Sequence, residues 1–141
     1  MAGPRLDDDQ YRDLLRFRTA LRRFLHWSDQ QANAAGLTAQ QHQLLLAIRG
    51  HEGPSSPTVG ELADSLLLKH HSLVELVDRA EQAGFVNRAV DGDDRRVVRV
   101  RLTMLGRRVL ERLTAAHLQE LTRLAPTIER VARGLGDDAP S

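Results

Sequence analysis

The chain has 141 residues, of which 41% are hydrophobic and 28% are charged, and its formal net charge is +1. These values are ordinary for a soluble globular protein, and so small a net charge provides no global field that attracts nucleic acid. The absence of cysteine excludes disulfides, thiolate catalysis and cysteine-ligated zinc. No apolar run approaches the ~18 residues of a membrane span, and the polar start MAGPRLDDDQ lacks the apolar core of a secretion signal. We therefore expect a cytoplasmic protein without a membrane segment.

Apolar residues at helical spacing predict a first helix from about Asp8 to Ala35. Leu14, Leu21 and Leu25 belong to its apolar stripe, and Gly36 is placed to end it. With roughly 25 residues, this helix is much longer than the mean of ~11–12. Long helices near a chain terminus often pair with another chain.

Two capping boxes predict the starts of the next two helices. Thr38-Ala-Gln-Gln41 opens one helix, and Thr58-Val-Gly-Glu61 opens a short one that ends at about Leu66. The turn-forming stretch GHEGPSSP separates the two helices. A fourth helix is expected from about Lys69 to Gln82, so the short helix and its successor have the outline of a helix-turn-helix.

The region after the fourth helix predicts a β-hairpin with strands at residues 85–89 and 97–102. Valine and leucine alternate with arginine in the second strand, and Asp91-Gly92 supplies turn chemistry between the strands. Residues 85–108 hold seven arginines and three aspartates, a local excess of four positive charges. Arginine makes bidentate contacts to phosphate and guanine. A hairpin after a helix-turn-helix forms a wing.

A second long helix should follow the hairpin. Thr103 can cap it, and it is expected to run to about Leu124. Pro126 either kinks this helix or is the first residue of a short final helix that stops at Gly134. The predicted fold class is therefore mainly α, of the α+β type, with a winged helix-turn-helix flanked by long N- and C-terminal helices.

Short motifs occur in a fixed order along residues 62–106. They are Leu62-Ala63, Leu76-Val77-Asp78-Arg79, Gly84, Phe85-Val86-Asn87-Arg88, Asp94-Arg95-Arg96 and Leu102-Thr103-Met104-Leu105-Gly106. Their spacing closely resembles the MarR family (multiple-antibiotic-resistance-type regulators), and the order of predicted elements extends the resemblance to nearly the full chain. The resemblance implies a homodimeric winged-helix DNA-binding protein, usually a repressor, that a small aromatic ligand often releases from DNA. It also implies a dimerisation lobe of residues 1–36 and 104–141 and a DNA-binding lobe of residues 37–103.

The resemblance assigns the tip of the wing to the DNA minor groove. Arg96 is expected to enter the groove, where the negative potential is deep, and Asp94 is expected to fix the rotamer of Arg96. Arg95 is expected to contact phosphate or the groove. A surface ion pair of little energetic value is the alternative for Asp94 and Arg96.

Two further arginines of the wing are candidate phosphate contacts. Arg88 aligns with an arginine of the family, and Arg99 lies on the polar face of the second strand. For Arg99 and its neighbour Arg101, solvation of the strand edge is an equal alternative.

The fourth helix should enter the major groove, where residues near its N-terminus read base edges. Those residues are Lys69, His70, His71, Ser72 and Glu75. Glu75 departs from the family pattern, since a carboxylate can only accept a hydrogen bond, for example from cytosine, and repels phosphate. Leu67 stands at a turn position where glycine is frequent. His70 and His71 point about 100° apart on a helix, so we expect no metal site and no cofactor.

Aromatic residues near the end of the first helix are candidates for a ligand pocket where the first two helices meet the winged lobe. The candidates are Phe24, His26, Trp27 and His42. Ordinary aromatic core packing is the alternative for each of them.

The sequence therefore predicts a regulator and not an enzyme, because it contains no catalytic constellation. The expected partners are double-stranded DNA with a pseudo-palindromic operator, a second copy of the chain and a small aromatic effector. A winged-helix module that binds another protein and no DNA is the alternative. Glu75 favours this alternative, whereas Arg95 and Arg96 oppose it.

Overall fold

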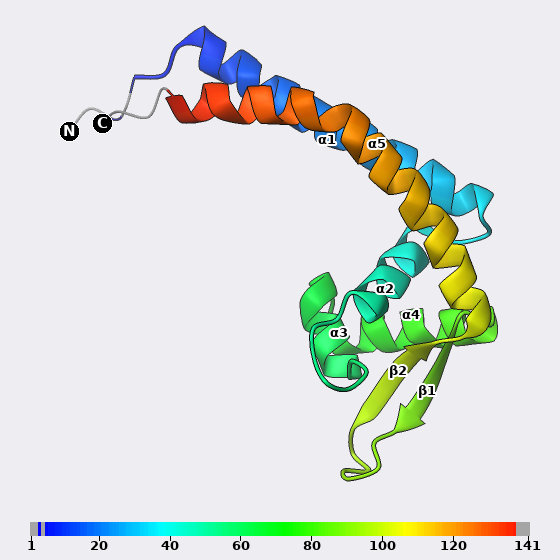
Figure 1. Cartoon of the computed structure of the whole chain (residues 1–141). Coiled ribbons are helices and arrows are strands. Elements are labelled where there is room, and N and C mark those ends of the chain that lie inside the picture. The colour runs from blue at the N-terminus through cyan, green and yellow to red at the C-terminus, as the bar shows by residue number, and fades with distance from the viewer. Residues whose placement is uncertain (1–2, 4, 138–141) are drawn as a thin grey trace. The chain divides into compact units, whose positions relative to one another are not determined.

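The computed structural model describes residue 3 and residues 5–137, with side-chain surroundings as far as residue 134. The elements are α1 (Asp8–Ala34), α2 (Ala39–Arg49), α3 (Val59–Leu66), α4 (His70–Gln82), β1 (Val86–Val90), β2 (Val98–Leu102) and α5 (Met104–Asp137) (Figure 1). This order confirms the predicted mainly helical class with one small antiparallel sheet. In the part of the chain that the structure describes, no helix is both long and apolar enough to cross a membrane.

The chain divides into two compact units whose boundaries lie inside the long helices. The winged-helix unit is Gln31–Thr114, and the long-helix unit comprises the chain before residue 31 and after residue 114. The predicted lobe boundaries at residues 36 and 104 lie instead at the ends of the long helices. The functional division into a dimerisation lobe and a DNA-binding lobe stays a prediction.

Both predicted capping boxes are confirmed. Thr38 Oγ1 accepts a hydrogen bond from Gln41 N (3.1 Å), and Gln41 Oε1 accepts one from Thr38 N (3.0 Å). Thr58 and Glu61 make the same reciprocal pair at 3.1 and 3.2 Å. These bonds satisfy amide groups that have no partner within the helix, so the sequence sets where α2 and α3 begin.

Three helices end on a residue in the left-handed backbone region. Gly36 and Gly84 end α1 and α4, each with φ of +86°. Leu67 ends α3 with φ 56° and ψ 41°, and Leu68 N donates to Ala63 O (2.9 Å) across this turn. Glycine adopts this conformation freely, whereas another residue loses about 1–2 kcal/mol in it. The turn of the helix-turn-helix is therefore strained at Leu67.

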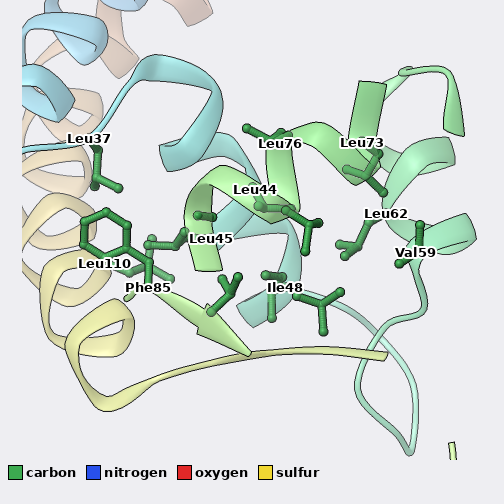
Figure 2. Packing of buried hydrophobic residues seen from close by; sticks show 14 of the residues in the cluster. Leu37, Leu44, Leu45, Ile48, Val59, Leu62, Leu73, Leu76, Phe85 and Leu110 are labelled. Atoms are coloured by element: carbon green, nitrogen blue, oxygen red, sulfur yellow. The ribbon is translucent and has the colours of Figure 1, made fainter. Parts of the chain in front are cut away.

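The core of the winged-helix unit fixes α3 and α4 against the hairpin. Figure 2 shows its apolar side chains converging from these elements and from α2. The largest fully buried side chains are Leu44, Leu45, Leu62, Leu73, Val77, Val86 and Val100. Complete burial of such a side chain stabilises the fold by about 1.5–3 kcal/mol, so this core holds α3, α4 and the hairpin together.

The wing is a hairpin with a third segment attached to its second strand. β1 and β2 pair antiparallel, from Val86 opposite Leu102 to Val90 opposite Val98. Thr58 forms a bridge with Arg99, and Val100 N donates to Pro57 O (3.0 Å). The loop before α3 thus covers the free edge of β2, which would otherwise expose unpaired backbone groups.

The loop at the tip of the hairpin is wider than a two-residue Asp91-Gly92 turn. Asp91 N donates to Val97 O (2.9 Å), and Val97 N donates to Asp94 O (3.0 Å). Gly92 does not adopt a positive φ. The side chain of Asp91, rather than the flexibility of Gly92, shapes this loop, as its contacts below demonstrate.

Of the two alternatives for Pro126, the start of a separate final helix is wrong, because α5 continues through Pro126 to Asp137. A proline inside a helix removes one backbone hydrogen bond. In the long-helix unit, residues on both sides of the proline lie beside α1: His117 bonds Ser28, and Thr127 and Val131 line a groove together with residues of α1. α5 therefore tolerates Pro126 without ending, and the proline does not begin a separate helix.

Candidate nucleic-acid interface

The tip of the wing holds an arginine in a defined position. Arg96 N donates to Asp94 Oδ1 (3.0 Å), and the guanidinium donates to both carboxylate oxygens of Asp94, from Nε at 3.2 Å and from Nη2 at 3.3 Å. The side-chain hydrogen bond from Arg96, followed by that from its backbone N–H, lowers the pKa of Asp94. The Arg96 side chain is nevertheless 91% exposed. Its guanidinium is therefore oriented by Asp94 and still open to a partner.

The loop at the tip of the wing is braced by a second aspartate–arginine pair. Arg99 Nε donates to Asp91 Oδ1 (2.7 Å), and Arg99 Nη1 donates to the carbonyl of Ser56 (2.6 Å). Asp91 Oδ2 accepts from the backbone N–H groups of Asp93 and Asp94. The bond from Arg99, and then that from Asp94 N–H, lowers the pKa of Asp91. Asp91 thus shapes the loop that carries Asp94, and Arg99 ties that loop to the segment before α3.

Arg88 connects the first strand of the wing to α4. Its guanidinium bonds Asp78 Oδ1 (2.6 Å) and Glu81 Oε1 (3.2 Å), and its backbone N donates to Glu81 Oε2 (2.9 Å). The backbone bond from Arg88 is the main cause of the lowered pKa of Glu81. A phosphate group would have to compete with two carboxylates for Arg88 and with one for Arg99. Their predicted roles as phosphate contacts therefore stay predictions, and their present contacts are structural.

The first turn of α4 presents polar side chains to solvent. Lys69 precedes the helix without capping it, Ser72 is half-buried, and His70, His71 and Glu75 are exposed. The opposite face is buried through Leu73, Leu76, Val77 and Ala80. Among the residues that the structure describes, no group of three or more acidic or histidine side chains could hold a metal ion.

A concave surface of about 620 Å³ lies between the start of α3, α4 and the wing. It brings together His70, Arg88 and Arg96 from the predicted site. The other predicted DNA-contacting side chains do not line this surface; they are Lys69, His71, Ser72, Glu75, Arg95 and Arg99. The hollow therefore lies at the junction between the helix-turn-helix and the wing, and the predicted site extends beyond it.

Two of the predicted ligand-pocket residues form part of an aromatic cluster in the long-helix unit. The rings of Phe24 and Trp27 lie 5.9 Å apart, and the His117 ring lies 4.8 Å from Trp27. His117 Nε2 and Ser28 Oγ are 2.6 Å apart. Sequence reasoning missed Ser28 and His117 because they are 89 residues apart and no local pattern connects them.

The two predicted pocket histidines belong to different units of the chain. His26 is exposed on α1, and His42 is buried in the winged-helix unit with 7% of its surface accessible. A ligand pocket formed by Phe24, His26, Trp27 and His42 stays a prediction.

A helix-turn-helix followed by an arginine-tipped wing defines a protein of the winged-helix class. A model of the MarR family matches residues 35–97. YhbI of Bacillus subtilis (strain 168), an uncharacterized HTH-type transcriptional regulator, is 30% identical over 110 residues, which cover 67% of this chain and 71% of YhbI. The chain belongs to the MarR family, whose members are transcription regulators and not enzymes.

A second relative matches a smaller part of the chain. The HTH-type transcriptional regulator PecS of Dickeya dadantii (strain 3937) is 28% identical over 83 residues, 59% of this chain. The match spans half the length of PecS.

Solved structures of the same family have the same fold. A MepR–DNA complex from S. aureus matches with a TM-score of 0.71 and 21% identity, over 86% of this chain and 91% of MepR. Wild-type apo MarR from E. coli matches with a TM-score of 0.67 and 24% identity, over 87% of this chain and 93% of MarR. At these identities the likeness concerns the fold alone.

Proposed function

We propose that the chain is a homodimeric, sequence-specific DNA-binding regulator that acts in the cytoplasm as a ligand-responsive repressor. The observation that carries this proposal is the tip of the wing, where Asp94 orients Arg96 while the guanidinium stays exposed. A planar guanidinium on a thin hairpin fits a narrow minor groove, where the negative potential is deepest. MepR has been solved in complex with DNA, which supports a nucleic-acid partner for the shared fold.

The start of α4 is proposed to read bases in the major groove. His71 can donate to guanine or phosphate, and Glu75 can accept from the amino group of cytosine. Both side chains are exposed. Arg95 is proposed to contact phosphate or the groove beside Arg96, and Lys69, His70 and Ser72 complete the surface that faces the DNA.

Self-association through the long-helix unit is supported by its apolar surface. Exposed large apolar side chains in this unit are Leu6, Tyr11, Leu14, Leu15, Leu21, Leu25, Leu118 and Leu121. A groove of about 630 Å³ between α1 and α5 is lined in part by Leu15 and Val131. Large exposed apolar patches commonly mark interaction sites. A two-fold dimer would present two α4 helices to half-sites about one DNA turn, ~34 Å, apart, hence a pseudo-palindromic operator.

Ligand response is proposed to use the aromatic cluster of Phe24 and Trp27, together with His26 and His42. Clustered aromatic rings beside a hydroxyl and an imidazole suit a small aromatic effector. Titration of aromatic carboxylic acids against a labelled protein–DNA complex tests this part. Failure of every such acid to release the DNA would leave a regulator that binds constitutively.

Replacement of Arg96 tests the DNA-binding proposal. We expect Arg96→Ala to weaken binding to the intergenic DNA beside the chain's own coding sequence by about tenfold or more, because a good groove contact contributes about 1–3 kcal/mol. Fluorescence anisotropy at several salt concentrations measures the affinity. Arg112→Ala, an exposed arginine on α5, removes the same charge and should leave the affinity unchanged.

Two results would contradict the proposal in different ways. Equal affinity of the Arg96→Ala variant and the parent chain would exclude the minor-groove role. No binding of any DNA by the parent chain would favour the alternative, a winged-helix module that binds another protein.

A further inference from the structure

A second hollow in the winged-helix unit has a different lining from that of the concave surface between α4 and the wing. It has a volume of about 350 Å³ and is formed by the end of α2, the loop before α3, the end of β2 and the start of α5. Its lining residues are Ile48, Arg49, His51, Gly53, Ser55, Ser56, Pro57, Arg101, Leu102 and Arg107. None of them lines the concave surface between α4 and the wing.

Three arginines from three different elements meet around this hollow, and its lining contains no carboxylate. The side chains of Arg49 and Arg107 form no hydrogen bond or ion pair with any residue that the structure describes. Arg101 donates from Nε to Ser56 Oγ (3.0 Å), which orients its guanidinium. Its terminal amino groups bond no residue within the described part of the chain. Like charges that converge without a counter-charge repel each other. An anion in the hollow would remove this repulsion and use donors that have no partner.

The acidic side chain that contacts His51 of the lining takes part in the cap of α3. Glu61 Oε2 lies 3.2 Å from His51 Nε2, and Glu61 Oε1 accepts from Thr58 N. The bond from Thr58 N–H is the main cause of the lowered pKa of Glu61. Glu61 therefore serves the cap of α3 and contributes no oxygen to the lining of the hollow.

We propose that this hollow binds the phosphate group of a free small molecule, with Arg49, Arg101 and Arg107 as the binding residues. Each guanidinium offers several donors in a planar fork that matches phosphate oxygens, and the hydroxyl groups of Ser55 and Ser56 add neutral donors. The volume lies at the small end of ordinary ligand pockets, as a phosphate with a small organic group requires. A phosphate of the DNA backbone has the same chemistry, and the experiment distinguishes the two sources.

Titration with inorganic phosphate tests the site on the full chain, without DNA. In chloride buffer at constant ionic strength, we expect saturable shifts of the arginine Nε–H NMR signals of Arg49, Arg101 and Arg107. The double variant Arg49→Ala, Arg107→Ala should bind phosphate at least about tenfold more weakly, since a hydrogen bond to a charged group contributes enough free energy for that factor. The control pair Arg108→Ala, Arg112→Ala removes equal charge from exposed positions of α5 outside the hollow and should keep the affinity.

Circular dichroism verifies that both double variants are folded, and Arg→Gln versions replace any that is not. NMR shifts that do not saturate in the parent chain would overturn the proposal. An equal loss of phosphate affinity in both double variants would also overturn it, because it would reveal only a general attraction of anions to positive charge. Because this titration contains no DNA, its failure is distinct from a failure of the proposed DNA binding.

A second measurement separates a free ligand from the DNA backbone. In phosphate-free buffer, we expect the double variant Arg49→Ala, Arg107→Ala to bind DNA with the same affinity and salt dependence as the control double variant. A selective loss of DNA affinity in the Arg49/Arg107 pair would assign the hollow to a backbone phosphate and overturn the proposal of a free ligand.

Discussion

At the turn between α3 and α4, Leu67 has φ 56° and ψ 41°, and its side chain is 93% exposed. Relief of the left-handed strain outweighs the extra entropy of glycine in the unfolded chain. We expect Leu67→Gly to raise the free energy of unfolding by about 1 kcal/mol, measured by urea denaturation. Leu67→Ala keeps the strain and loses little packing, so it should change the stability only slightly. If Leu67→Gly instead lowers the free energy of unfolding, the leucine side chain must make a stabilising contact outside this single copy of the chain.

The brace between Asp91 and Arg99 leads to a prediction on pH. The pKa of Asp91 is lowered from 3.8, first by the bond from Arg99 and then by the N–H of Asp94. A carboxyl whose folded pKa is depressed stabilises the fold above its unfolded pKa, and this contribution disappears as the pH falls through the lower, folded value. We expect the Asp91 carboxyl carbon to titrate below pH 3.8 in an NMR experiment.

Two arginine variants identify the origin of that shift. Arg99→Met removes the largest cause and should move the midpoint of Asp91 upward. Arg101→Met alters a neighbouring arginine that bonds Ser56 instead of Asp91 and should leave the midpoint in place. An upward shift of the same size in both variants would assign the effect to general charge and not to the brace.

At the scale of elements, the start of α5 depends on a close backbone approach. Thr103 Oγ1 accepts from Gly106 N (3.0 Å) and donates to Gly84 O (2.6 Å). A Cβ atom on Gly106 would lie 2.2 Å from the carbonyl oxygen of Phe85, so the helix or the strand would have to move. We expect Gly106→Ala to lower the free energy of unfolding by about 1–3 kcal/mol, as overpacking does.

A second glycine provides the matched control for this prediction. Gly60 lies inside α3, and the nearest atom to an added Cβ is Thr58 Oγ1 at 3.9 Å. Gly60→Ala should therefore stabilise the chain by about 0.5–1 kcal/mol through helix propensity. Thermal and chemical denaturation measure the stability of both variants. A less stable Gly106→Ala together with a more stable Gly60→Ala would support the steric account, and a stabilising Gly106→Ala would contradict it.

The elements show which features the sequence could predict and which it could not. The starts of α2 and α3 were predictable because a capping box needs only residues three apart, such as Thr38 and Gln41. The continuation of α5 was not predictable, because a proline is locally unfavourable in a helix. A local sequence pattern predicts hydrogen bonds between nearby residues, whereas it does not predict contacts between residues far apart in the chain.

The same distinction applies to the candidate site. Asp94 and Arg96 are two residues apart, and their contact agrees with the orientation that the family resemblance implied. The bond from Arg99 to Ser56 spans 43 residues, and no periodic pattern signals it. For this reason the sequence left phosphate contact and solvation of the strand edge as equal alternatives for Arg99, and it did not predict the bonds of Arg99 to Asp91 and Ser56.

At the scale of the whole molecule, the proposed dimer can be tested through one exposed leucine. Leu15 in the long-helix unit is 62% exposed, and burial against a second copy would make a charge there costly. We expect Leu15→Glu to raise the dimer dissociation constant by about tenfold or more, since burying a leucine stabilises by about 1.5–3 kcal/mol. Sedimentation equilibrium measures this constant.

A matched leucine outside the long-helix unit controls for the added charge. Leu67→Glu changes the most exposed of these apolar side chains, at the helix-turn-helix, and should leave the association unchanged. A monomeric parent chain at micromolar concentration, or equal weakening by both variants, would contradict dimerisation through the long helices.

The third segment of the wing also bears on the order of folding. Val90 and Val98 meet across a short loop, whereas Thr58 meets Arg99 across 41 residues. The entropic cost of closing a loop rises with its length, so the hairpin can close by itself before it docks. During synthesis, residues 56–58 have no strand to pair with until Arg99 has left the ribosome. We therefore expect α3 and α4 to pack first and the wing to be the last part of the winged-helix unit that is held in place.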